Sequence, residues 1–336
     1  DTDGTDPSNA TDVEMTGANS TLVLLAAENI GFDSVNGSIF DDQSASAIDI
    51  DVEQLTAVAT NGSVKIDELN DVRLVGNSTA NATNIAMSFM LLANDNITLN
   101  GDATSGLGVS NANAAVGNVL GGNVYLQAGS NYSFDVNLSP EVQQSTNGTD
   151  GNGSLIVDVG AGAVGDANTN QTIVRGEQIL LGGNLFSAFN DLKVETYVPS
   201  TQRIEFLGGA TFTLQSGRDL SLAGNLTGNG TGAIDATIQA VFNITTDGDI
   251  GPAPGEQLTL RMFAGENITI GNADNVSAVN LSTNGGDLTL RADSDWSAGF
   301  SSNRSGTVIF NTNNTNGTDK NINIDSGSGD FTIGGA

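Results

Sequence analysis

Short runs of alternating apolar and polar residues recur along almost the whole chain. Each run covers only a few positions and is bounded by Gly, Asn, Asp or Ser. Alternation with a period of two is typical of β-strands, and the bounding residues favour tight turns. No stretch of 12 residues keeps the helical spacing of i, i+3, i+4 and i+7. The pattern predicts an all-β chain, with strands that include Leu22–Leu25, Ile48–Val52, Val64–Ile66, Ile97–Leu99, Val124–Leu126 and Leu155–Val159.

One short motif repeats, mainly in the second half of the chain: an Asp or Asn followed by an apolar, a polar and an apolar residue. It begins at Asn96, Asp219, Asn267, Asp287, Asn321 and Asp330. Ile268, Leu288 and Val308 lie 20 positions apart, which predicts coils of about 20–24 residues. A single coil cannot bury its inner face alone, so the coils are expected to stack into a β-solenoid.

These copies resemble the repeats of filamentous-haemagglutinin-like adhesins. The resemblance rests on Gly-Asp-Leu-Thr-Leu at 286–290 and its variant at 329–333, and covers mainly residues 204–336. It implies a right-handed parallel β-helix. The Asn-Pro-Asn motifs of that family's secretion domain are absent from the sequence, so its two-partner export route is not implied.

The expected organisation is an exposed acidic leader over residues 1–20, followed by one elongated solenoid domain over residues 21–336. About 14 coils, spaced about 4.8 Å apart, would give a rod about 65–70 Å long. The chain starts at Asp1 with no signal peptide and no apolar run long enough to span a membrane, so we interpret it as a processed form or a fragment.

Asn-X-Ser/Thr sequons are unusually frequent, with 21 in a chain that has neither Cys nor His. Chance placement of its Asn, Ser and Thr would give about 7. Turn preference alone would also bring these residues together, but less often. Asn137 is a poorer acceptor because Pro140 follows its sequon. The predicted sites of covalent N-linked glycans are Asn9, Asn19, Asn36, Asn61, Asn77, Asn81, Asn96, Asn131, Asn147, Asn152, Asn170, Asn225, Asn229, Asn243, Asn267, Asn275, Asn280, Asn303, Asn313 and Asn316.

Charge and composition restrict the partners. The net charge is −29, from 39 acidic and 10 basic residues, which argues against nucleic acid as a partner. The sequons predict an extracellular, cell-surface location. The absence of His and Cys removes the usual nucleophile and base arrangements, so we do not expect an enzyme. Ca²⁺ is the cofactor that the oxygen ligands would suit, but the sequence does not fix its ligands.

A stretch without sequons, residues 173–224, is richer in aromatic and basic side chains than its surroundings. It is either a subunit contact or ordinary core with a chance gap. The chain also stops within a strand pattern, which suggests either truncation or head-to-tail stacking into a homopolymer. The predicted contact residues are Phe186, Phe189, Tyr197, Arg203, Phe331 and Ile333.

The leading hypothesis is a structural subunit of a glycosylated cell-surface filament or matrix fibre. The first alternative is an adhesin with a glycan- or cell-binding face. The second is a polysaccharide-active β-helix enzyme, which would need paired carboxylates such as Asp247 and Asp249.

Overall fold

The computed structural model contains strands and turns, and no helix, in the part of the chain that it describes. All strand pairs described are parallel, which confirms the prediction of an all-β chain and its parallel strands. The chain divides into two compact units, residues 1–177 and 178–336. The described residues are 13–15, 20–31, 39–40, 48–80, 88–93, 95–100, 109–111, 123–128, 154–158, 163–164, 171–176, 178–182, 185–188, 191–196, 203–207, 211–229, 232–251, 257–271, 279–292, 308–310, 322–325 and 331–334.

The first unit contains short strands, most of them two to six residues long. They are β1 (Val13–Glu14), β2 (Thr21–Ala26), β3 (Ile30–Gly31), β4 (Ile39–Phe40), β5 (Ile48–Asp51), β6 (Gln54–Ala59), β7 (Val64–Glu68), β8 (Val72–Leu74), β9 (Ser78–Ala80), β10 (Ser88–Ala93), β11 (Ile97–Asn100), β12 (Val109–Asn111), β13 (Asn123–Ala128), β14 (Ser154–Asp158), β15 (Ala163–Val164) and β16 (Thr172–Gly176).

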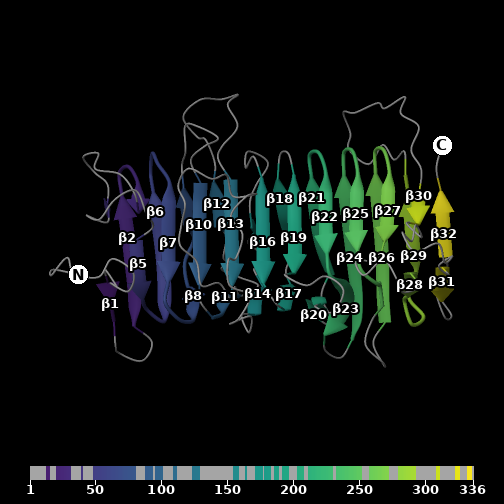
Figure 1. The fold of residues 1–336 in the computed structure, drawn as a ribbon, viewed down its shortest axis with the longest axis horizontal. Helices are drawn as coiled ribbons and strands as arrows, with labels where there is room; N and C mark the ends of the chain where they lie inside the picture. The colour runs from purple at the N-terminus through teal and green to yellow at the C-terminus, as the bar shows by residue number, and fades with distance from the viewer. Residues whose placement is uncertain are drawn as a thin grey trace, which may run out of the picture. The chain divides into compact units, whose positions relative to one another are not determined.

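Apart from β3, which pairs with β4 as well as with β7, the strands of the first unit pair with strands further along the chain and not with their immediate neighbours. One series runs β1, β5, β7, β10, β13 and β16, and Figure 1 shows β7, β10 and β13 side by side in that order. In another, β2 pairs with β6, and β6 pairs with β8 and β9. β8 and β9 continue to β11 and β12 respectively. Strand β1 lies within the segment expected to be an exposed leader, and it pairs with β5.

The second unit has the same construction with longer strands near its middle. They are β17 (Gln178–Gly182), β18 (Leu185–Ala188), β19 (Leu192–Thr196), β20 (Arg203–Leu207), β21 (Thr211–Ser216), β22 (Leu220–Ala223), β23 (Asn225–Asn229), β24 (Ala233–Ala240), β25 (Ile244–Asp247), β26 (Gln257–Ala264), β27 (Ile268–Gly271), β28 (Val279–Ser282), β29 (Leu288–Arg291), β30 (Val308–Phe310), β31 (Ile322–Asp325) and β32 (Phe331–Gly334).

Three series of parallel pairs organise the second unit. The first is β19, β22, β25, β27 and β30, and the second is β18, β21, β24, β26, β29 and β32. A third joins β17, β20 and β23, while β28 pairs with β31. The elements of the first series stand next to one another in Figure 1.

Alternating burial explains why these segments form strands. Along β24 and β26, every second side chain is buried and the residues between them are half-buried. Ile234 pairs with Leu258 and Ile238 with Met262, so the buried side chains of successive strands stack in register. Full burial of one such side chain stabilises the fold by roughly 1.5–3 kcal/mol. Many small contributions of this kind hold together a core with few aromatic residues.

Two glycines show how closely the chain packs at the corners. Gly31 has φ of 116°, and a Cβ there would lie 2.6 Å from the backbone oxygen of Lys65. A Cβ on Gly265 would collide with the backbone oxygen of Val241. A side chain at either position would force neighbouring backbone segments apart, so Gly is required there.

The structure corrects the predicted 20-residue spacing. Ile268 pairs with Val308, 40 positions later, whereas Leu288 belongs to another series and pairs with Phe331. A shift of 20 residues therefore relates strands that are not stacked on each other. The same Asp/Asn-led motif precedes strands in both series, which made the shift look like a repeat. The spacing between stacked residues is 24 from Leu220 to Ile244 and again to Ile268, within the predicted 20–24.

Candidate functional site: a ladder of asparagine and aspartate side chains

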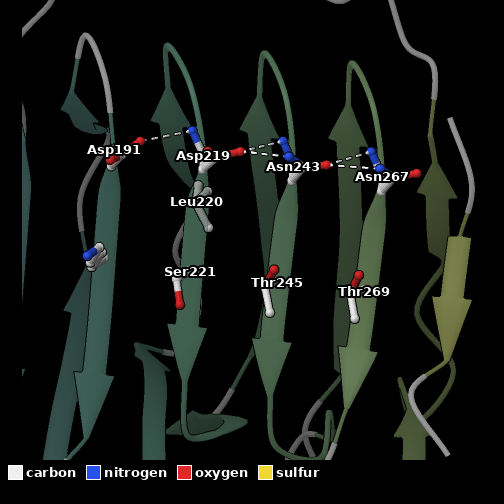
Figure 2. Close-up of a pocket in the computed structure, with 9 residues that line it drawn as sticks. Asp191, Asp219, Leu220, Ser221, Asn243, Thr245, Asn267 and Thr269 are labelled. Atoms are coloured by element: carbon white, nitrogen blue, oxygen red, sulfur yellow. Dashed lines mark hydrogen bonds between the residues drawn. The ribbon is translucent and has the colours of Figure 1, made fainter. Parts of the chain in front are cut away.

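An Asp or Asn stands immediately before each of four stacked strands of the second unit. These residues are Asp191 before β19, Asp219 before β22, Asn243 before β25 and Asn267 before β27. Figure 2 shows the four side chains in one row across the strands, each reaching towards the next. We call this row the main ladder. Asx side chains suit this position because they readily accept hydrogen bonds from backbone N–H groups at chain reversals.

Each rung of the main ladder accepts hydrogen bonds from the next. The Asn243 Nδ2 and backbone N–H both donate to Asp219 Oδ1, at 2.9 and 3.1 Å. Asn267 repeats the arrangement on Asn243 Oδ1, at 3.1 Å from Nδ2 and 3.2 Å from the backbone nitrogen. The Asp219 backbone N–H donates to Asp191 Oδ1 at 3.4 Å. The ladder thus satisfies backbone donors at the start of strands and fixes the stacking register.

The energetic value of the ladder comes from repetition. A neutral hydrogen bond adds about 0.5–1.5 kcal/mol to stability, and a bond to a charged acceptor adds about 1.5–3 kcal/mol. The bonds to Asp219 belong to the stronger class because their acceptor is a carboxylate.

A second ladder lies elsewhere in the same unit. The Asp249 backbone N–H donates to Asn225 Oδ1 at 3.0 Å. Asn280 then donates to Asp249, from its backbone nitrogen at 3.0 Å and from Nδ2 at 2.9 Å. Asn225 begins β23, Asp249 precedes the bridge residue Ile250, and Asn280 lies in β28.

The first unit contains two pairs of Asx residues that are bonded in the same way as neighbouring rungs of a ladder. Asn96, just before β11, donates to Asp71 Oδ1 from its backbone nitrogen at 2.9 Å and from Nδ2 at 2.7 Å. Asn70 Nδ2 donates to Asp51 Oδ1 at 3.0 Å. Both units therefore use Asx side chains to connect stacked corners. The repeated Asp/Asn-led motif was the sequence signal for these positions, although sequence analysis did not assign them this role.

Arg218 compensates the two carboxylates of the main ladder. Its Nε lies 3.8 Å from Asp191 Oδ1 and 3.5 Å from Asp219 Oδ2. The Arg218 side chain is 57% exposed, so solvent screens both ion pairs and each is worth at most about 1 kcal/mol. The arginine lowers repulsion between stacked acids in a strongly acidic chain.

A groove of about 460 Å³ runs beside the main ladder on the solvent side of the stacked strands. Ser221, Thr245 and Thr269 form a row of hydroxyl side chains in register (Figure 2). Lys193 pairs with Ser221 and so continues the row at one end. Successive rows of a parallel sheet lie about 4.8 Å apart. The lining therefore offers a regular array of hydroxyl, amide and carboxylate groups, which suits water or a polyhydroxylated ligand.

The structure places the predicted glycan acceptors in distinct environments. Asn61 and Asn77 are exposed in turns. Asn96, Asn225, Asn243, Asn267 and Asn280 are half-buried members of the ladders. Asn229 lies in β23. The remaining acceptors lie outside the described residues: Asn9, Asn19, Asn36, Asn81, Asn131, Asn147, Asn152, Asn170, Asn275, Asn303, Asn313 and Asn316.

The predicted subunit-contact residues belong to different strands. Phe186 lies in β18 and pairs with Leu214, and the exposed Arg203 begins β20. Phe331 and Ile333 lie in β32 and pair with β29. Phe189 and Tyr197 fall outside the described residues. The contact itself stays a prediction.

The carboxylate pair considered for catalysis has a structural position. Asp249 is a rung of the second ladder, and Asp247 ends β25. For calcium, the described part of the chain holds no group of three or more acidic side chains placed to bind a metal ion. The Ca²⁺ hypothesis thus gains no ligand set.

Strand β7 carries a buried acid, Glu68, and a buried base, Lys65, which were not among the residues predicted from the sequence. Glu68 is fully buried, and its carboxyl group accepts bonds from the backbone N–H groups of Val52, at 3.1 and 3.3 Å, and Asn70, at 3.2 Å. Burial raises the pKa of Glu68 to about 8, although these N–H donors oppose the shift. Burial also lowers the pKa of Lys65 to about 8. No motif marks either residue.

A buried polar and aromatic cluster lies on the same sheet of the first unit. Met90, Leu92, Tyr125 and Ile173 pack together on one face, opposite the face formed by Phe89 and its neighbours. The Tyr125 hydroxyl donates to Gln127 Oε1 and accepts a bond from Arg175 at 3.2 Å. The guanidinium of Arg175 also lies 5.8 Å from the centre of the Tyr125 ring. These strands are therefore buried on both faces.

Comparison with known proteins adds no relative: no family model matches the chain, and neither the curated proteins nor the solved structures give a match. The resemblance to filamentous-haemagglutinin-like repeats stays a prediction. In the described residues, there is no helix with the length and apolar character needed to cross a membrane.

Proposed function

We propose that the protein is an extracellular, N-glycosylated structural subunit whose parallel strands wind into a right-handed β-helix. In this proposal, the subunits associate head to tail into a cell-surface filament or matrix fibre. The ladders are the observation that carries the proposal, because their side chains bond one coil to the next and are not arranged for binding or catalysis.

Three features support a structural role. The buried side chains of successive strands stack in register, which suits a fold extended by adding coils. The ladder residues bond to the next rung in line, so their contribution grows with the number of coils. The high sequon content and a net charge of −29 would keep the outer surface hydrated.

Self-association follows from the geometry of such folds in general. A β-helix presents unpaired backbone groups at the edge of its last coil, and pairing of such edges between subunits gives an open, non-closing assembly. Strands that are already parallel and in register offer a template for this addition.

The test is to secrete the chain from a glycosylating host and examine it by negative-stain microscopy and intact-mass measurement. We expect fibres with a constant width and a regular axial repeat, and a mass above the 34.2 kDa of the polypeptide. The same chain from a host without glycosylation is the control. Isolated globular particles at all concentrations would reject the filament, and an unmodified mass would reject the glycoprotein.

An adhesin is the second candidate, because the groove beside the main ladder presents a row of hydroxyl groups. A glycan array probed with the secreted chain tests it. We expect binding that is lost on combining Ser221→Ala, Thr245→Val and Thr269→Val. No binding by the unaltered chain would reject this candidate.

A further inference from the structure

Five sequons begin at a rung of a ladder. They are Asn96-Ile97-Thr98, Asn225-Leu226-Thr227, Asn243-Ile244-Thr245, Asn267-Ile268-Thr269 and Asn280-Leu281-Ser282. In each, the first residue bonds across coils, the second is buried and the third does not enter the core. An Asn rung followed by a strand with one buried apolar residue and then an outward Ser or Thr therefore has the sequence of a sequon, whether or not it carries sugar.

The acceptor atom is engaged in four of these five sequons. Nδ2 donates to the neighbouring rung from Asn96 at 2.7 Å, from Asn243 at 2.9 Å, from Asn267 at 3.1 Å and from Asn280 at 2.9 Å. Asn225 uses its Oδ1 as acceptor for the Asp249 backbone N–H at 3.0 Å. All five side chains are half-buried between stacked corners.

Glycan transfer needs the same atom. The reaction bonds Nδ2 to the anomeric carbon of a lipid-diphosphate-linked oligosaccharide, and Nδ2 loses one proton while the lipid diphosphate leaves. The modified nitrogen keeps a single N–H and carries a bulky sugar. Adjacent rungs lie about 4.8 Å apart, which leaves no space for that sugar between them.

The sequons at Asn61 and Asn77 differ in both respects. Both asparagines are exposed in turns, and in the described part of the chain neither side chain is a rung of a ladder. A sugar at these positions would extend into solvent without displacing a bond between coils.

We infer that seven of the sequons form two classes: the five ladder asparagines are unmodified structural residues, and Asn61 and Asn77 are glycan acceptors. The acceptor half of this inference rests on the proposed glycoprotein function. The structural half does not, because it follows from the hydrogen bonds between rungs and from the close spacing of the rungs. Because the space between adjacent rungs is too small for a sugar, glycosylation of a ladder sequon and stacking of its coil exclude each other.

Site-by-site glycopeptide mass spectrometry tests the division on chain secreted from a glycosylating host and purified as folded, protease-resistant protein. We expect sugar at Asn61 and Asn77, and bare asparagine at the five ladder positions. Sugar at a ladder asparagine in that material would overturn the inference.

Two variants separate the ladder role from the acceptor role at one sequon. Thr245→Ala destroys the sequon but keeps the Asn243 side chain, whereas Asn243→Ala removes both. In chain made without glycosylation, we expect Asn243→Ala to lower the melting temperature by about 2–4 °C and Thr245→Ala to leave it nearly unchanged. Equal melting temperatures for the two variants would contradict the structural role.

The two measurements keep the proposals apart. If no sequon carries sugar, the proposed glycoprotein function fails and so does the acceptor half, while the melting comparison still decides the role of Asn243. If sugar is found only at Asn61, Asn77 and sites outside the ladders, both proposals are supported.

Discussion

The outer faces of two stacked series of strands differ sharply. In β22, β25 and β27, inward residues are buried while Ser221, Thr245 and Thr269 face the groove beside the main ladder. In β10 and β13, the residues from Phe89 to Ala93 and from Val124 to Ala128 are all buried. The same parallel backbone therefore supports either a solvated outer face or a second apolar layer.

The two units use different contacts to hold neighbouring strands in register. In the second unit, inward packing is supplemented at the corners by Asx hydrogen bonds. In the first unit, the buried cluster of Met90, Leu92, Tyr125 and Ile173, which we call the outer cluster, adds packing between neighbouring strands. We expect the apolar layer to contribute more per residue, because large-to-small changes in packed regions cost more than loss of one hydrogen bond.

The largest expected effect comes from truncating the outer cluster. Leu92→Ala removes a fully buried side chain, so the free energy of unfolding should fall by about 2–5 kcal/mol. The matched control is Thr269→Ala on the outer face of β27, which should change stability by less than about 0.5 kcal/mol. Urea unfolding monitored by circular dichroism measures both. Similar losses would show that the two outer faces do not differ in energy.

A smaller effect is expected at the main ladder. Asp219→Ala removes the acceptor of two hydrogen bonds from Asn243 and should cost about 1–3 kcal/mol. Asp219→Asn keeps an oxygen acceptor without the charge and should recover much of that loss. The same urea experiment compares the two. If Asp219→Ala is as stable as Asp219→Asn, the hydrogen bonds of the ladder do not stabilise the fold.

A third expected effect is a change in pH dependence. Because the pKa of Glu68 is raised to about 8 in the folded chain, its contribution to stability is present at low pH and is lost as pH rises from about 4.5 to 8. Lys65, whose pKa is lowered to about 8, makes the opposite contribution, a gain in stability as pH rises from about 8 to 10.5. The sum of these two contributions is lowest near pH 8.

Glu68→Gln isolates the first of these contributions. It should flatten the fall in stability between about pH 4.5 and 8, measured by urea unfolding at several pH values. Glu266→Gln, at a half-buried position in the second unit, serves as the control. A wild-type slope that persists in Glu68→Gln would assign the pH dependence to other acids.

The sequence predicted the strands well because alternation reports burial of one face directly. Leu22–Leu25 falls within β2 and Ile97–Leu99 within β11. The second apolar layer was not predicted, although the run Phe89–Ala93 carries the signal of a strand buried on both faces. What covers a face depends on contacts distant in sequence, and no local pattern records them.

The ladders were harder to predict, because one motif has two explanations. Asn243-Ile244-Thr245 reads equally as a glycan acceptor and as a corner followed by a strand. Only the position of Asp219 beside Asn243 distinguishes these two explanations, and the two residues are 24 positions apart in sequence. The buried Glu68 gave no signal at all, since acids are common throughout the chain.

The order of residues in the main ladder has a consequence for ageing. Deamidation of Asn243 would replace its amide with a carboxylate, and Asp191, Asp219 and residue 243 would then form three adjacent acids in one row. The Nδ2 donor towards Asp219 would be lost, and repulsion would take the place of attraction. Slow chemical damage at a single amide would therefore loosen the stacked strands there, leaving the apolar interior unaltered.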